Sequence, residues 1–432
     1  MMRYKADANY VRGQDGEDKL AKFRKQFHIP KTKAGEDCIY LCGNSLGLQP
    51  KGVEAAVRQE LDDWKTLGVE GHFHAKHPWL PYHEPLTALA AGVVGAKPSE
   101  VVMMNGLTVN LHLMMVSFYR PTKERFKILI EGNCFPSDRY AVESQIRFHG
   151  FDPATALVQL QPRAGEATLR MDDVEALIDK EGNSIALIMI GGVHYYTGQL
   201  YDMARITKAG HKRDCVVGFD LAHAAGNVPL DLHKWDVDFA CWCSYKYLNS
   251  GPGSVAGCFV HERHAKDFDR PRFAGWWGHD KSTRFKMGPE FHPMAGAEGW
   301  QLSNPPILSF AASRASLELF RDAGMDRLRE KSEKLTGFLE FLLTDMKLPG
   351  LKILTPTNPA ERGCQLSLTL AEGGRRVFDV LTASGVICDW REPDCIRVAP
   401  VPLYNTFADV YAFARILSAA VGGGSVKPKA AM

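Results

Sequence analysis

The sequence carries almost no excess charge, because 52 lysines and arginines are balanced by 50 aspartates and glutamates, for a formal net charge of +2. It also has no long basic run. Proteins that bind nucleic acids present concentrated positive charge to the phosphates, so we predict no nucleic-acid partner. No apolar run is long enough to span a bilayer, and the first residues lack the apolar stretch of a signal peptide. We therefore predict no membrane association.

None of the ten cysteines forms a CxxC pair. Several of them, such as Cys215, Cys241 and Cys243, lie inside apolar, strand-like runs. A chain of 432 residues can build a core without disulfides. The pattern favours reduced, buried thiols and a cytoplasmic protein.

The usual zinc motifs are also missing. The histidines of the segment 71–77 include no HExxH pair, and Pro78 interrupts the run. We predict no metal site. We interpret the segment as an active-site loop in which His72 touches a substrate, and we leave His74 and His77 without a role.

The length of the chain favours two domains. Between residues 97 and 260, short apolar runs alternate with helix-like stretches, which predicts parallel strands joined by helical crossovers. The predicted strands are 101–104, 127–131, 156–160, 184–190, 216–220 and 238–243, and the predicted helices are 109–119, 138–148, 171–180 and 203–213. Ligands of such sheets bind at the carboxyl ends of the strands, so functional residues should follow strands directly.

The alternation fades after about residue 300, which predicts a second α+β domain. Its expected elements are helices 307–320 and 326–343, strand 365–370, helix 375–384, strand 386–389 and a closing helix 407–420. We interpret 389–392 as a solvated loop, 251–253 as a turn and the glycine-rich end, 422–432, as a flexible tail.

Two strand ends carry a carboxylate and a lysine. Asp220 ends the strand 216–220 and is followed by His223, while Lys246 follows the strand 238–243. A pyridoxal phosphate (PLP) enzyme needs a lysine for a Schiff base and a carboxylate near the pyridine nitrogen. Each residue alone is more often a helix cap or a solvated lysine. The combination of Asp-x-x-His with Ser-Tyr-Lys is much more specific.

Two further strand ends suggest how such a cofactor would be held. The segment 105–110 opens a helix with Thr108, and backbone N–H groups at a helix N-terminus form an anion site. Phe135 follows another strand and could stack on a planar ring. The alternatives are a capped helix without a ligand and a turn in which Ser137 or Asp138 caps the next helix.

Taken together, these stretches resemble kynureninases, which belong to the aminotransferase-like (fold type I) group of PLP enzymes. Cofactor motifs alone would indicate only that larger group. The specific stretches are 41–50 (LCGNSLGLQP), 275–279 (GWWGH) and 303–306 (SNPP). Further matches lie at 105–110, 135–138, 218–224, 241–249 and 397–400, so the resemblance runs over almost the full length.

The resemblance implies a role for each matching residue. Lys246 would carry PLP as a Schiff base, Asp220 would pair with the pyridine nitrogen, and Phe135 would stack on the ring. Arg397 would clamp the substrate carboxylate, as its planar fork suits, and Arg391 is a weaker candidate. The implied catalytic residues are Lys246, Tyr245 and Asp220, and the implied substrate contacts are Ser45, His72, Asn304 and Arg397. The implied cofactor shell is Leu107, Thr108, Phe135, Pro136, Ser137, Asp138, Asp220, His223, Tyr245, Lys246, Trp276 and Asn304.

The resemblance also implies an overall architecture. We expect an α/β fold with an aminotransferase-like large domain and a mostly parallel sheet, plus a smaller α+β domain. The expected division is an N-terminal segment, 1–50, that packs with the small domain, a large domain, 51–310, a small domain, 311–421, and the tail. We expect a homodimer in which Trp276 and Asn304 reach across from the partner. Gly191 stands where relatives often carry a hydroxyl residue, so we leave it out of the site.

The implied reaction is hydrolysis of the Cβ–Cγ bond of L-kynurenine or 3-hydroxy-L-kynurenine, a step of tryptophan catabolism and of NAD biosynthesis. The products are L-alanine with anthranilate or 3-hydroxyanthranilate. One alternative is another fold type I reaction, such as that of an aminotransferase or of a cysteine desulfurase with Cys364 as the reactive thiol, although nothing near Cys364 in the sequence marks it for that role. Another is a relative that binds the cofactor without catalysis, which the presence of Lys246, Asp220 and Arg397 together argues against.

Overall fold

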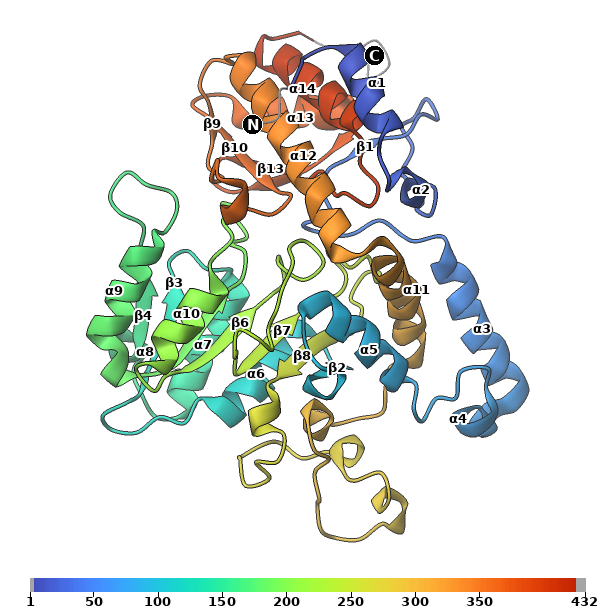
Figure 1. Ribbon diagram of the computed structural model, residues 1–432, viewed down its shortest axis with the longest axis vertical. Helices are drawn as coiled ribbons and strands as arrows, with labels where there is room; N and C mark the ends of the chain where they lie inside the picture. The colour runs from blue at the N-terminus through green and yellow to red at the C-terminus, as the bar shows by residue number, and fades with distance from the viewer. Residues whose placement is uncertain (1–3, 425–432) are drawn as a thin grey trace.

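The computed structural model describes residues 4–424, which form two lobes (Figure 1). The lower lobe in this view holds a seven-stranded sheet, and the upper lobe holds a four-stranded sheet. This architecture confirms the predicted α/β fold with a smaller α+β unit. Most of the predicted tail, 425–432, lies outside the described residues. Within residues 4–424, no helix combines the length and the apolar character needed to cross a membrane.

The large sheet has the strand order β2-β8-β7-β6-β5-β3-β4. Strands β4, β3, β5, β6 and β7 run parallel, and β8 is antiparallel to both of its neighbours. The carboxyl end of β2 therefore lies at the same edge as those of the parallel strands. The bounds are β2 (Val101–Met104), β3 (Lys127–Glu131), β4 (Leu157–Leu160), β5 (Ile185–Gly191), β6 (Val216–Asp220), β7 (Phe239–Trp242) and β8 (Ala256–Val260).

Both faces of this sheet are buried. Along β3, Leu129 packs into one apolar core, while Ile128 and Ile130 pack into another. This alternation follows from the two-residue period of a strand. It explains why the strands read as continuous apolar runs. The helices of this lobe are α3 (Gly52–Leu67), α4 (Gly71–His74), α5 (His83–Val94), α6 (Leu107–Phe118), α7 (Pro136–Phe148), α8 (Pro153–Ala156), α9 (Met171–Glu181), α10 (Met203–His211) and α11 (Ile307–Ala323).

Two features of the large sheet were missed from the sequence. Strand β8 was not predicted, although the turn at 251–253 that precedes it was. No α-helix lies between β6 and β7, where the segment 221–238 consists mainly of turns. The helical crossover is therefore absent at the one connection that carries Asp220 and His223 to the pocket described below.

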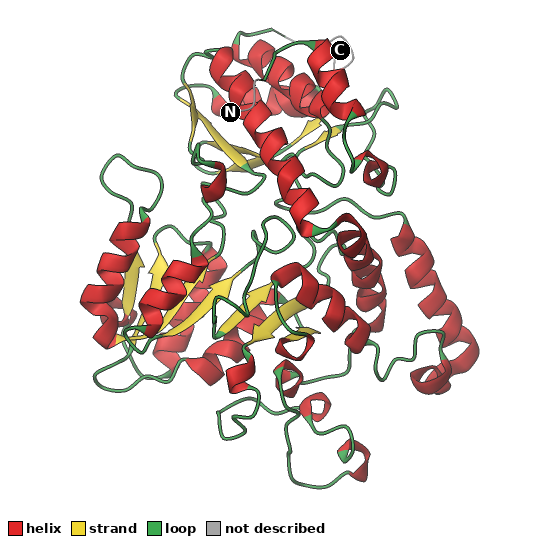
Figure 2. Cartoon of the chain, viewed as in Figure 1, coloured by secondary structure: helices red, strands yellow, loops and turns green. Residues whose placement is uncertain are grey.

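The upper lobe packs helices on an antiparallel sheet (Figure 2). Its core includes Leu335 and Leu339 of one helix, Phe413 and Leu417 of another, and Leu368 of the sheet. The elements are α12 (Met325–Asp345), α13 (Gly374–Ala383), α14 (Phe407–Val421), β9 (Leu351–Ile353), β10 (Leu366–Leu370), β12 (Asp389–Arg391) and β13 (Cys395–Val398). The prediction of a solvated loop at 389–392 was wrong, because Asp389, Trp390 and Arg391 form β12 and pair with β13.

The N-terminal segment contacts both cores. Helix α1 (Ala8–Gly16) contributes Val11 to the upper core, and α2 (Ala21–Arg24) contributes Phe23 to the lower one. Strand β1 (Ile39–Tyr40) pairs in parallel with β11 (Val386–Ile387) of the upper lobe. Helix α11 packs its side chains Phe310 and Phe320 into the lower core. The expected boundary between residues 310 and 311 falls inside this helix, and the division into domains stays a proposal.

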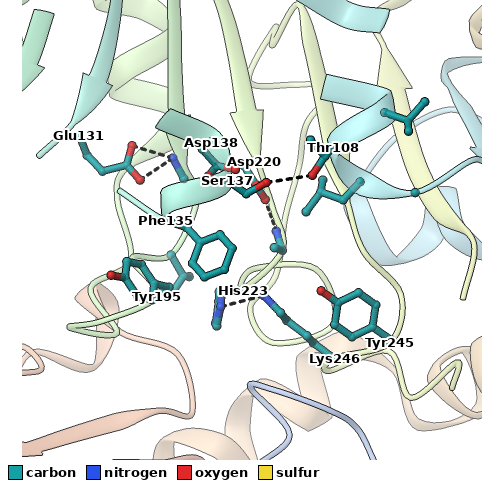
Figure 3. Close-up of a pocket in the computed structure, with 16 residues that line it drawn as sticks. Thr108, Glu131, Phe135, Ser137, Asp138, Tyr195, Asp220, His223, Tyr245 and Lys246 are labelled. Carbon is teal, nitrogen blue, oxygen red and sulfur yellow. Dashed lines mark hydrogen bonds between the residues drawn. The ribbon is translucent and has the colours of Figure 1, made fainter. Parts of the chain in front are cut away.

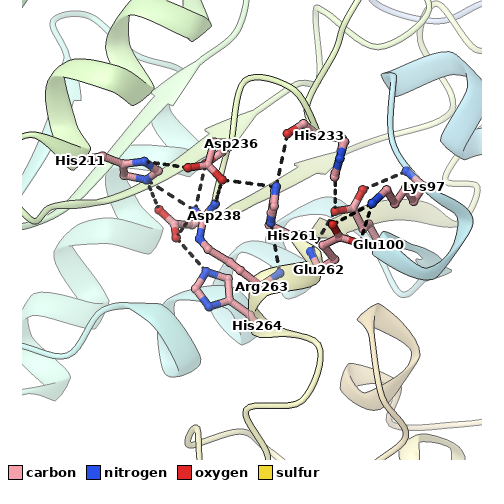
Figure 4. Close-up of polar contacts among 10 residues, drawn as sticks. All are labelled: Lys97, Glu100, His211, His233, Asp236, Asp238, His261, Glu262, Arg263 and His264. Atoms are coloured by element: carbon pink, nitrogen blue, oxygen red, sulfur yellow. Dashed lines mark hydrogen bonds and ion pairs between the residues drawn. The ribbon is translucent and has the colours of Figure 1, made fainter.

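A polar cluster lies at the amino-terminal edge of the parallel strands (Figure 4). Asp238, directly before β7, lies 2.9 Å from His211 Nε2 and 2.8 Å from His264 Nε2, and it accepts a hydrogen bond from Arg263 Nη2 at 2.6 Å. Burial would raise the pKa of Asp238, but hydrogen bonds from these partners and the charge of Arg263 hold it well below its usual range. The cluster thus fixes the start of the segment 262–306, which projects from the lower lobe (Figure 1).

Candidate active site

A pocket of about 360 Å³ opens at the carboxyl edge of the large sheet (Figure 3). Residues at or after the ends of β2, β3, β5, β6 and β7 line it. This location is the one expected for a ligand site in a doubly wound sheet. The predicted residues that line the pocket are Leu107, Thr108, Phe135, Ser137, Asp138, Asp220, His223, Tyr245 and Lys246.

Lys246 extends into this pocket from the loop after β7. Its Nζ lies 3.0 Å from His223 Nε2 and 5.7 Å from the centre of the Phe135 ring. His223 is buried, and burial together with the charge of Lys246 lowers the pKa of this histidine well below its usual range. The imidazole is therefore neutral, so its Nε2 can accept a hydrogen bond from the lysine.

The loop that carries Lys246 packs against the segment 41–50. The backbone N–H of Gly47 donates to the carbonyl of Tyr245 at 2.8 Å. A Cβ atom on Gly47 would lie 2.3 Å from the carbonyl oxygen of Lys246, well inside van der Waals contact. A Cβ on Gly43 would lie 2.4 Å from the hydroxyl of Tyr404. Both glycines of this motif are therefore required by close packing against other parts of the chain.

Asp220 and Asp138 form a buried pair of hydrogen-bonded carboxyl groups. Burial and the neighbouring charge of Asp220 raise the pKa of Asp138 well above its usual range. Burial also raises the pKa of Asp220, but a 2.6 Å hydrogen bond from the Ala222 N–H, the charge of Lys246 and the bond from Asp138 counteract that effect. Asp138 therefore holds the proton of the pair and Asp220 the negative charge.

Two helix N-termini meet beside these carboxyl groups. Helix α6 begins at Leu107 and α7 begins at Pro136, and neither has a side-chain cap. The hydroxyls of Thr108 and Ser137 lie 3.1 Å apart and join the two termini. Uncapped N–H groups and hydroxyls at a helix N-terminus suit an anion such as a phosphate.

Aromatic side chains cover another side of the pocket. Phe135 is 41% exposed, and its ring packs edge-on against Tyr195 with the ring centres 5.3 Å apart. The ring of Tyr245 lies 5.9 Å from Lys246 Nζ. Burial raises the pKa of Tyr245, so this phenol keeps its proton at neutral pH. Phe135 thus offers an open ring face on which a planar ligand can stack.

Several residues implied by the resemblance do not line this pocket. They are Ser45, His72, Pro136, Trp276, Asn304 and Arg397. His72 lies on α4 with its Nδ1 2.9 Å from the Val69 carbonyl. Trp276 is 42% exposed on the projecting segment, and its Nε1 donates to the Arg284 carbonyl.

The guanidinium group of Arg397 already has partners within the chain. It is buried on β13, pairs with Asp389, and donates from Nη1 to the Tyr195 carbonyl at 2.6 Å. Its Nε has no partner among the described residues. Arg391, on β12, also pairs with Asp389, at 3.1 Å. The two arginines therefore share one carboxylate.

The pocket also contains residues that sequence reasoning did not select. Glu131 ends β3 and Gly191 ends β5, and both line the cavity with Tyr195. Both residues stand at the carboxyl end of a strand, where ligand-binding residues were expected, and this expectation could have identified them. Gly191 was left out because it lacks a side chain, yet its N–H lies 3.2 Å from each oxygen of Glu131.

Comparisons with known proteins agree with this geometry. A family model described as the kynureninase C-terminal domain matches residues 328–417. A kynureninase of Koribacter versatilis is 64% identical over 405 residues, which cover 94% of this chain and 96% of the relative. A kynureninase of Myxococcus xanthus is 58% identical over 409 residues, which cover 95% and 96%.

Solved structures with a similar fold are more distant. The cysteine desulfurase CsdA from Escherichia coli superposes with a TM-score of 0.76 at 18% identity, covering 93% of this chain and 98% of that one. A C-DES mutant with glycine covalently linked to its PLP cofactor gives a TM-score of 0.75 at 18% identity, covering 91% and 98%. These structures support the fold alone. The high identity to curated relatives over nearly the whole length shows that the chain belongs to the kynureninase family.

Proposed function

We propose that the protein is a PLP-dependent kynureninase that hydrolyses the Cβ–Cγ bond of L-kynurenine or its 3-hydroxy form. The observation that carries the proposal is the position of Lys246, whose Nζ enters a pocket that also presents a buried carboxylate and an anion cradle. Membership of the family supports the same reaction. The products would be L-alanine and anthranilate, or its 3-hydroxy form.

The residues present fit PLP. The two uncapped helix N-termini, with the hydroxyls of Thr108 and Ser137, would hold the phosphate. Phe135 would stack on the ring, and Asp220 would face its nitrogen. Among residues 4–424, no carboxylate lies within ion-pair distance of Lys246, whose Nζ contacts His223. The amine is therefore available for a covalent bond with the aldehyde carbon. Bound PLP supplies an electron-accepting ring.

Tyr245 and Lys246, in the loop after β7, would carry out the proton transfers. With substrate bound, the free amine of Lys246 would take the proton from the substrate Cα. The neutral His223, 3.0 Å away, would then receive a hydrogen bond from this amine and hold it in place. Tyr245 keeps its proton at neutral pH and would deliver it to Cβ as the bond to the aryl ketone breaks. Water adds to the γ-carbonyl, so one water molecule enters per bond cleaved.

Substrate binding would use residues at the border of the pocket. Arg397 would bind the substrate carboxylate through its unpartnered Nε and by exchanging the Nη1 contact with the Tyr195 carbonyl, while Asp389 keeps the guanidinium in place. Ser45, His72 and Asn304 would contact the aromatic end. We infer a homodimer in which Trp276 and Asn304 reach the partner's pocket, because both lie outside the pocket of their own chain. A cytoplasmic location is inferred from the free thiols.

The desulfurase alternative loses support from the position of Cys364. A desulfurase needs an accessible, reactive thiol. Cys364 is fully buried, and burial raises the pKa of its thiol to about 12. A thiol in that state is a poor nucleophile.

The decisive test is a product assay on purified protein with added PLP, with kynurenine and 3-hydroxykynurenine in parallel. Alanine and the matching anthranilate should form with wild-type protein and with the Lys123→Ala control, an exposed lysine. The Lys246→Ala variant should lose about a thousandfold in turnover, because Lys246 carries the one amine among the residues that line the pocket. Normal turnover in that variant, or no product from the wild type, would refute the proposal.

A further inference from the structure

A third buried carboxyl group lies at the same edge of the sheet as Asp220 and Asp138. Glu131, at the end of β3, is 4% exposed and lines the pocket. Its neighbour Gly191 ends β5, and Gly191 in turn lies opposite Asp220 in the register of β5 and β6. The adjacent strands β3, β5 and β6 thus bring Glu131, Gly191 and Asp220 together; Glu131 and Asp220 can be followed in Figure 3.

The carboxyl group of Glu131 occupies the space beside Gly191. A Cβ atom on Gly191 would lie 2.9 Å from Glu131 Oε1, so any side chain there would displace the carboxyl group. The Gly191 N–H lies 3.2 Å from both oxygens and donates to the group. Glycine at this position therefore leaves room for the glutamate, and the hydrogen bond ties the end of β3 to the end of β5.

Among residues 4–424, no lysine, arginine or histidine forms an ion pair with Glu131. The ionisable groups that interact electrostatically with Glu131 are Asp220 from β6, Asp138 from α7, Cys134 before α7 and Tyr201 after β5. All four are neutral or negative. A buried carboxylate without a cation is costly, and a second negative charge beside Asp220 adds repulsion. The charge of Lys246 lowers the pKa of Asp138 and of Asp220.

We propose that Glu131 is a positioning residue that works as a neutral carboxylic acid, filling the space beside Gly191 and leaving Asp220 as the only carboxylate charge that faces the cofactor. Burial raises the pKa of Glu131 to about 7, hydrogen bonds from its own N–H and from the Gly191 N–H oppose this rise, and the charge of Asp220 adds a smaller increase. Ionisation of Glu131 above that pH would add a second negative charge to the site. The proposal rests on the cofactor site assigned under the proposed function.

The test is infrared spectroscopy of the full-length apoprotein, which needs neither cofactor nor substrate. The difference between wild type and Glu131→Gln should contain the carbonyl band of a protonated carboxylic acid at a pH of about 6, and mainly carboxylate bands at about 8. The control Glu124→Gln removes an exposed glutamate outside the pocket, and the band that Glu131→Gln removes should remain in it. Carboxylate bands alone at the lower pH for Glu131 would overturn the proposal.

Two further measurements separate the possible outcomes. Gly191→Ala should remove or shift the same band, because its methyl group would displace the carboxyl group, and this variant also serves if Glu131→Gln fails to fold. With PLP bound, the absorption of the wild type should change in a step near pH 7 that Glu131→Gln lacks. A step that persists in Glu131→Gln would overturn the effect on the cofactor. Because the infrared result is independent of turnover, failure of the kynureninase assignment would leave it standing.

Discussion

Gly47 offers a sharp test of how the lysine is positioned. Its N–H binds the carbonyl of Tyr245, and a Cβ atom at this residue would lie 2.3 Å from the carbonyl oxygen of Lys246. Ordinary contacts begin near 3.4 Å, so Gly47→Ala has to move the two segments apart by about 1 Å. The contacting atom is backbone, which cannot rotate away as the end of a flexible side chain can.

The expected effect is large on activity and moderate on stability. A displacement of ~1 Å in a catalytic group can lower the rate by roughly a hundredfold. Overpacking of this kind costs about 1–3 kcal/mol in unfolding free energy. We therefore expect Gly47→Ala to remain folded, with kcat/KM for kynurenine lowered by about two orders of magnitude and with an altered absorption of bound PLP.

The matched control is Gly52→Ala. Gly52 is exposed on α3 and has no neighbouring atom within 4 Å of an added Cβ. Gly52 is the first residue of α3, where the preference of a helix interior for alanine over glycine does not apply in full, so this variant should have nearly unchanged stability and full activity. Both proteins would be compared by product formation, PLP absorption and thermal unfolding. A Gly47→Ala protein with kcat/KM within threefold of this control would refute the reasoning.

Three other predictions concern the cluster, the phosphate cradle and the arginines. Asp238→Ala should lower the free energy of unfolding by about 1–3 kcal/mol, because it leaves the buried Val217 N–H without its acceptor and removes hydrogen bonds from the partly buried His211 and His264. Since the folded pKa of Asp238 is depressed, its contribution is present above a pH of about 4 and is lost as the pH falls below that value; denaturant unfolding at pH 7 and pH 3 checks both statements. Thr108→Ala should weaken PLP binding roughly tenfold, through loss of about 1.5 kcal/mol in one hydrogen bond to a charged group, as measured by titration of apoprotein. Arg397→Lys should raise KM for kynurenine by at least tenfold, because lysine lacks the bidentate fork, and Arg391→Lys should change it less; an equal effect of both would contradict the assignment.

Much of the fold could be predicted because local pattern and burial coincide. The strands of the large sheet are buried on both faces, so they read as apolar runs, and their ends marked Asp220 and Lys246 as functional. Strand β8 was missed because it contains Ala256, Gly257 and Cys258, which carry little β-propensity. Glycine at 257 is required because Trp242 fills the space beside it. Asp389 and Arg391 were read as solvated because charged residues usually are, whereas Asp389 pairs with both Arg391 and Arg397 and so stabilises β12.

The sequence by itself determined the class of fold, the family and the chemistry of the lysine, because these depend on residue types and on local spacing. Only the tertiary structure decided which groups share a pocket and in what state of protonation. Gly47 packs against the backbone of Lys246, and Glu131 fills the space beside Gly191. Asp138 donates a hydrogen bond to Asp220. These relations join segments far apart in the chain, and the pKa of a buried group depends on its neighbours in space, which spacing along the sequence does not encode.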